Sequence, residues 1–154
     1  MKKLFTLLVL TLVAATGCKS QSTSAQAKKL AQSGVTYEYK ASTRGTLMEI
    51  SITQKEIAAT KGRPGEDTAA PLKVTPEKGW NTLLEETAKL NLNGLETLAV
   101  PSKKHQFDGA LAASLKIMAD GKTYTTPTFD HGNPPAEIKA LVEKIIELSE
   151  LEKQ

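Results

Sequence analysis

The chain has 154 residues and a formal net charge of +3, from 20 basic and 17 acidic side chains. A chain of this length favours one domain that buries about two thirds of its unfolded surface. Its single cysteine, Cys18, excludes an internal disulfide. The near balance of charges argues against a nucleic-acid partner, because such proteins carry a basic patch.

The first seventeen residues have the layout of a secretory signal peptide. Lys2 and Lys3 precede an apolar run, residues 4–13, and small residues follow it up to Cys18. The run is shorter than the roughly 20 residues that a membrane-spanning helix needs. We therefore expect residues 1–17 to be removed rather than to anchor the protein by themselves.

The end of this segment, Ala15-Thr16-Gly17-Cys18, resembles the processing site of bacterial lipoprotein precursors. The resemblance implies cleavage after Gly17, lipid attachment to the Cys18 sulfur and acylation of the new amino terminus. Such acyl chains would hold the protein on a membrane of the cell envelope. Lys19 stands where an aspartate would indicate inner-membrane retention, so the resemblance favours the outer membrane of a diderm organism. An ordinary cleaved signal with an incidental cysteine is the alternative.

Composition divides the remaining chain into two parts. Residues 18–33 are rich in Ser, Gln, Ala and Lys and lack aromatics, which predicts a flexible tether whose last residues can be helical. Residues 34–154 are expected to form the single folded domain. Alternating apolar and polar residues there predict strands at 35–42 and 48–53, joined as a hairpin, and shorter strands at 56–61 and 72–74.

A helix is expected from Pro76 to about Asn91, with Thr75 as its N-cap. Trp80 lies on its apolar stripe, where an aromatic residue is more often part of the core than a ligand-stacking group. Residues 95–101 are expected to form a connector with buried leucines, followed by a basic loop.

The strongest structural pattern follows that loop. Asp120-Gly121 suits the positive φ angles of a two-residue type I′ turn, which sets Ile117 opposite Tyr124 in a second hairpin. Asn133, as N-cap, and two prolines are expected to begin a second amphipathic helix that ends near Glu150. The resulting order of hairpin, helix, hairpin, helix predicts an α+β fold. We expect an antiparallel sheet of about four to six strands with both helices packed on one face.

The second hairpin also predicts where polar side chains meet. Its two ends lie together opposite the turn, which brings residues near His105 and Asp108 beside Asp130 and His131. Two carboxylates and two imidazoles suit a divalent metal or acid–base chemistry. The alternative, which we favour, is structural: Asp108 and Asp130 accept hydrogen bonds from backbone amides beside glycine turns. We therefore expect no metal, no cofactor and no catalytic residue, and at most a polar binding site at Asp108, Asp130 and His131.

The chain contains no phosphate-binding glycine loop, no metal-spaced Cys or His pair and no G-x-S-x-G motif. The carboxylate groups of Glu85 with Glu86, and of Glu147, Glu150 and Glu152, are expected to be solvated helix residues without a role. The leading hypothesis is a lipid-anchored, non-enzymatic module, possibly inhibitor-like in build, that binds a protein or another envelope component. The alternatives are a small hydrolase or metal-dependent enzyme that uses the four predicted site residues, and a structural spacer.

Overall fold

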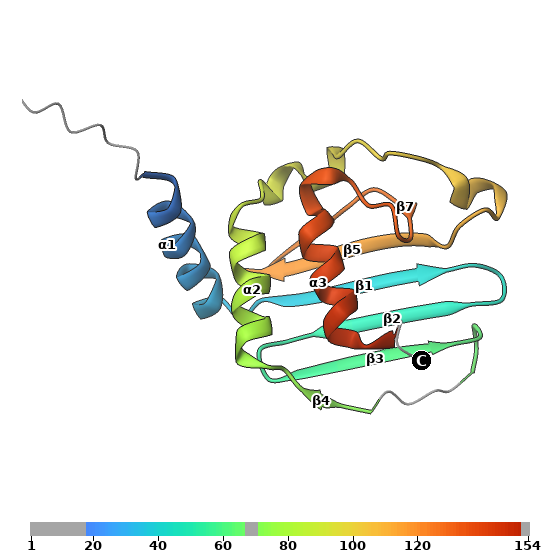
Figure 1. The fold of residues 1–154 in the computed structure, drawn as a ribbon, viewed down its shortest axis with the longest axis horizontal. Coiled ribbons are helices and arrows are strands. Elements are labelled where there is room, and N and C mark those ends of the chain that lie inside the picture. The colour runs from blue at the N-terminus through green and yellow to red at the C-terminus, as the bar shows by residue number, and fades with distance from the viewer. Residues whose placement is uncertain (1–17, 67–70, 152–154) are drawn as a thin grey trace, which may run out of the picture.

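The computed structural model describes residues 18–66 and 71–151 and has the predicted α+β fold (Figure 1). Residues 1–17, on which the signal prediction rests, lie outside the described residues. In chain order the elements are α1 (Cys18–Gln32), β1 (Thr36–Ser42), β2 (Leu47–Ile52), β3 (Glu56–Gly62), β4 (Lys73–Val74), α2 (Glu77–Ala88), η1 (Leu92–Thr97), η2 (Lys104–Phe107), β5 (Ala112–Ala119), β6 (Lys122–Thr125), β7 (Phe129–Asp130), η3 (Ala136–Ile138) and α3 (Lys139–Ser149).

All strands of the described chain belong to one antiparallel sheet with the order β4-β3-β2-β1-β5-β6, and β7 pairs with the beginning of β5. The sheet has seven strands rather than four to six because the two-residue strand β7 joins it as a separate strand. The first strand in sequence, β1, is central: its Tyr39 pairs with Ile50 of β2 on one side and with Leu115 of β5 on the other. Residues distant in sequence therefore meet at β1.

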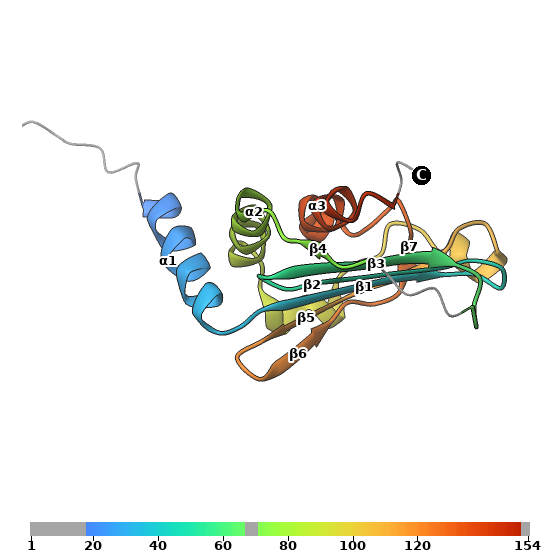
Figure 2. The same ribbon diagram turned by 90° about the horizontal axis from the view of Figure 1, so that it is seen from below.

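The helices α2 and α3 cover one face of the sheet, as predicted (Figure 2). Alternate residues of the strands point toward them, because successive side chains of a strand lie on opposite faces. The helices and the strand β5 contribute to one buried core. Its members include Trp80, Leu83, Leu115, Ile117, Leu141 and Ile145.

The predicted second hairpin is confirmed in detail. Asp120 and Gly121 have φ angles of 52° and 70°, and Ile117 pairs with Tyr124. Both residues of a type I′ turn require positive φ, which explains why this Asp-Gly pair sets the register so reliably.

The helix starts differ from the sequence prediction. Thr75 does not cap α2, since its hydroxyl donates instead to the Thr53 carbonyl oxygen at 2.8 Å and ties the helix start to the sheet. Asn133 does not cap α3 either, because η3 intervenes and Ile138 holds the N-cap position. A proline biases the residue before it toward extended backbone, so Pro134 and Pro135 delay the helix.

The segment predicted to be a tether also differs, because it forms α1. Its alanine, lysine, glutamine and leucine residues favour helix, and Ala27 and Leu30 are buried in the core cluster with exposed fractions of 9% and 8%. The segment packs beside α2 at one end of the sheet (Figure 2). No helix in the described part of the chain is long and apolar enough to cross a membrane.

Candidate functional site

Asp130 is the centre of a buried polar cluster at the β7 end of the sheet. Its side chain is 2% exposed. The Ser102 hydroxyl donates to Oδ2, as does the Lys104 amide at 2.9 Å. The His105 amide donates to Oδ1 at 2.8 Å, and the His105 Nδ1 lies 2.6 Å from the same oxygen. The carboxylate thus has four hydrogen-bonding partners within the chain.

Two opposing effects act on the pKa of Asp130. Burial raises it, but the hydrogen bond from Ser102 and those from the Lys104 and His105 amides and the His105 ring stabilise the charged form, and together they hold the pKa well below its usual range. Asp130 is therefore ionised at neutral pH. Because an ionised carboxylate only accepts hydrogen bonds, Nδ1 of His105 must carry a hydrogen and donate it to Oδ1.

The cluster fixes two loops to one another. Asp130 accepts the first backbone amides of η2, which have no partner within that short helix. On the other side, the Asn133 amide donates to the Asp130 carbonyl oxygen at 2.8 Å, and the Asn133 side chain donates to the Ser102 hydroxyl at 2.8 Å. The cluster therefore holds the loop before η2 and the loop after β7 in place.

The sequence prediction for this region is partly correct. The hairpin does bring His105 beside Asp130, and Asp130 accepts backbone amides as the structural alternative requires. His131 lies next to Asp130 but turns to β1, where its Nδ1 is 2.7 Å from the Tyr39 hydroxyl. Asp108 does not join them: it is an exposed residue with a φ of 55° that ends η2. The four predicted residues therefore do not converge on one point.

The arrangement lacks a nucleophile–base pair. In a hydrolytic triad the serine hydroxyl meets the imidazole and the carboxylate orients the imidazole from the far side. Here the Ser102 hydroxyl is bonded to the carboxylate itself. The geometry of Ser102, Asp130 and His105 thus builds a loop anchor.

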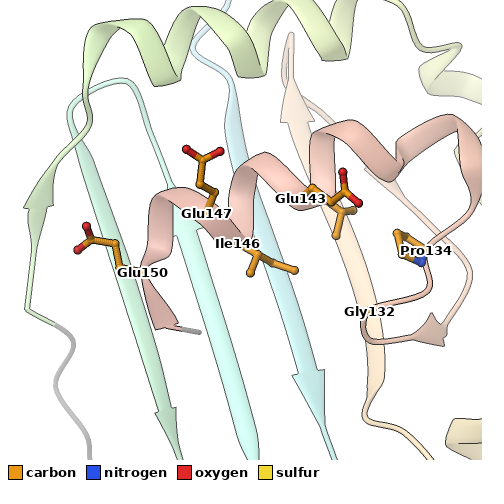
Figure 3. Close-up of a pocket in the computed structure, with 7 residues that line it drawn as sticks. Gly132, Pro134, Glu143, Ile146, Glu147 and Glu150 are labelled. Atoms are coloured by element: carbon orange, nitrogen blue, oxygen red, sulfur yellow. The ribbon is translucent and has the colours of Figure 1, made fainter. Parts of the chain in front are cut away.

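A pocket of about 410 Å³ lies next to this anchor, between α3 and the loop after β7 (Figure 3). In the close-up, Ile146 points from α3 toward the loop that carries Gly132 and Pro134. The lining consists of an apolar part, Pro134, Val142 and Ile146, and an acidic part, Glu143, Glu147 and Glu150. We call this pocket the α3 groove. Its volume falls within the range of small-ligand and side-chain binding pockets.

The glutamates of the α3 groove are loosely paired. Glu143 is 65% exposed and lies 3.8 Å from Lys139, while Glu147 is 63% exposed and 3.0 Å from Lys144. Glu150 is 50% exposed and lies 2.6 Å from Lys73, on β4. Exposed pairs of this kind contribute about 0 to 1 kcal/mol, so a cation on a ligand can compete with the lysines.

The α3 groove was missed by sequence reasoning, which gave Glu147 and Glu150 no role. The available signal was the spacing of Glu143, Glu147 and Glu150 along one side of an amphipathic helix. That spacing is equally typical of a solvated helix face. Only the neighbouring loop with Gly132 and Pro134 turns the face into one wall of a pocket.

Within the described residues no group of three or more His, Cys, Asp or Glu side chains is arranged to hold a metal ion. Comparison with known proteins found no matching family model, no matching curated protein and no matching solved structure.

Proposed function

We propose that this protein is a lipid-anchored protein of the cell envelope that acts as a non-enzymatic binding module, and that the α3 groove is its binding site. The ligand best suited to the groove is a segment of another envelope protein that carries both a basic and an apolar side chain. The observation that carries this proposal is the combination, in one pocket, of an apolar lining with the three glutamates.

The two halves of the groove suggest how such a segment binds. An apolar side chain entering beside Pro134, Val142 and Ile146 is removed from water, which is worth about 25 cal/mol per Å² of buried apolar surface. A lysine or arginine on the same segment reaches Glu143 or Glu147. Desolvation of these pairs in the complex strengthens them relative to the exposed lysine pairs that they replace.

The internal bonding of Asp130 supports a binding module over an enzyme. General acid–base chemistry needs a group within hydrogen-bond reach of the substrate. The carboxylate of Asp130 is 2% exposed and has four partners inside the chain, and the His105 ring is 11% exposed. A passive spacer, the other alternative, has no need of a pocket such as the α3 groove.

The binding proposal is tested with a pair of designed peptides. The first is an amphipathic leucine–lysine peptide, and the second has the same length with glutamate in place of each lysine. In calorimetric titrations we expect binding of the lysine peptide alone, weakened several-fold by Glu143→Gln combined with Glu147→Gln.

The matched control is Glu49→Gln. Glu49 is 49% exposed and pairs with Lys40 at 2.8 Å, but it lies on the sheet face opposite the helices. Equal binding of both peptides, or an equal effect of Glu49→Gln, contradicts the α3 groove as the site.

The anchoring proposal is tested separately by palmitate labelling in cells. We expect the wild-type chain to incorporate label and to fractionate with membranes, and Cys18→Ser to lose both properties. Equal labelling of the two chains contradicts lipidation at Cys18, whatever the peptide titrations show.

A further inference from the structure

The segment between η1 and the end of η2 forms an edge of the molecule with an unusual surface. It contains two lysines and no acidic residue, and its exposed positions include Ala99, Pro101, Lys103 and Lys104. At its end Phe107 is 84% exposed, the most exposed large apolar side chain in the described chain. We call residues 98–107 the basic edge.

The turn that carries the exposed Phe107 is fixed by backbone hydrogen bonds. Phe107 is the last residue of η2, whose first amides are bound by Asp130. The helix is closed behind Phe107 by a hydrogen bond from the Gly109 amide to the Lys104 carbonyl oxygen at 2.9 Å. The exposed ring therefore sits on an ordered turn, where a partner can contact it without reorganising the backbone.

We propose that the basic edge docks on the surface of a lipid bilayer, with Phe107 inserted at the level of the headgroups and Lys103 and Lys104 against anionic lipid. Aromatic rings suit this interfacial depth, and lysines near an anionic surface add attraction. Phe107 projects from the surface, which fits a bilayer because a bilayer needs no complementary shape. Acidic residues flank the edge at Glu96 and Asp108, so the positive charge is confined to the two lysines.

The position of α1 is consistent with this docking. In Figure 1 the blue first turn of α1 and the segment from η1 to η2 lie along the same upper side of the molecule. A lipid on Cys18 and the basic edge can then contact one membrane. None of the residues that line the α3 groove belongs to the basic edge.

The test uses the chain from residue 18 onward with Cys18→Ser, which contains every described helix and strand and carries no acyl chain. The outcome is therefore independent of lipidation and of the α3 groove. The protein is sedimented with vesicles of phosphatidylglycerol and phosphatidylcholine at low ionic strength. We expect binding, reduced roughly ten-fold by Phe107→Ala, because the variant loses the burial of a large apolar side chain.

Substitution of both lysines, Lys103→Gln with Lys104→Gln, should weaken binding to the anionic vesicles several-fold and have no effect on pure phosphatidylcholine vesicles. The matched control is Val74→Ala, because Val74 is 83% exposed but lies on β4 at the other edge of the sheet. We expect it to bind as the parent does.

A second readout follows the ring itself. Phe107→Trp should show a blue shift of its emission on addition of vesicles, while the parent, whose single tryptophan Trp80 is 4% exposed, should show none. Circular dichroism establishes that each variant is folded. Three outcomes would each overturn the proposal. They are absence of vesicle binding, an equal loss of vesicle binding with Val74→Ala, and Phe107-dependent retention by envelope proteins without vesicle binding.

Discussion

The Asp130 cluster and the α3 groove are neighbouring regions that both collect carboxylates, under very different conditions. Asp130 is 2% exposed and has four hydrogen-bonding partners from two residues of one loop and from Ser102. Glu143 and Glu147 are 65% and 63% exposed, and each meets a lysine of its own helix. The same functional group is thus fully enclosed at one site and open to exchange at the other.

The difference follows from the cost of desolvation. A buried carboxylate is tolerated only if internal donors replace its water, so all of its hydrogen-bonding capacity serves the fold. An exposed carboxylate remains hydrated and gains little free energy from its ion pair with lysine. A ligand can therefore displace either the hydrating water or the lysine. The two regions also cooperate, because the bonds of Asn133 to Asp130 and Ser102 fix the loop that forms the wall of the groove.

The largest expected loss of stability comes from a substitution on the buried side of α3. Leu141 is 1% exposed on the side of the helix that faces the sheet. Leu141→Ala should reduce the free energy of unfolding by about 2 to 5 kcal/mol, through lost burial and the cavity left behind. Urea denaturation measures it. A loss below about 0.5 kcal/mol would mean that the buried side of α3 is wrongly assigned.

The next largest effect tests the enclosed carboxylate. Asp130→Asn keeps the shape of the side chain but removes its charge. It also replaces one accepting oxygen by an NH₂ group that faces other hydrogen-bond donors. We therefore expect a clear loss of stability at neutral pH. The matched control, Asp108→Asn, changes an exposed residue of the same loop and should have little effect.

The pH dependence of this difference has a definite sign. The pKa of Asp130 is lowered in the folded protein, so its contribution is complete above the unfolded value of about 4 and is lost as the pH falls toward the lower folded value. The stability difference between wild type and Asp130→Asn should therefore be constant near neutral pH and shrink below about pH 4. A difference that stays constant down to the acid limit contradicts the enclosed, ionised carboxylate.

Much of this architecture could be predicted because local chemistry determined it. Asp120-Gly121 fixed the register of one hairpin, and the apolar stripe with Trp80 and Leu83 identified the buried side of α2. The polar sites depended on contacts across the chain. The spacing of residues brings His105 near Asp130, but only the loop conformation decides that Asp108 stays outside and that His131 meets Tyr39.

The smallest expected effect completes the comparison. Glu147→Gln removes a carboxylate that is 63% exposed, whereas Asp130 is 2% exposed, and Glu147 pairs with Lys144 three residues before it on the same helix. The free energy of unfolding should change by no more than about 0.5 kcal/mol, because such pairs are weak and screened by salt. Thermal and urea denaturation of the variant measure this change, with Glu49→Gln, at another exposed glutamate that pairs with a lysine, as the control. A loss comparable to that of Asp130→Asn would show that Glu147 is committed to the fold, and the α3 groove would then have no free carboxylate to offer a ligand at that position.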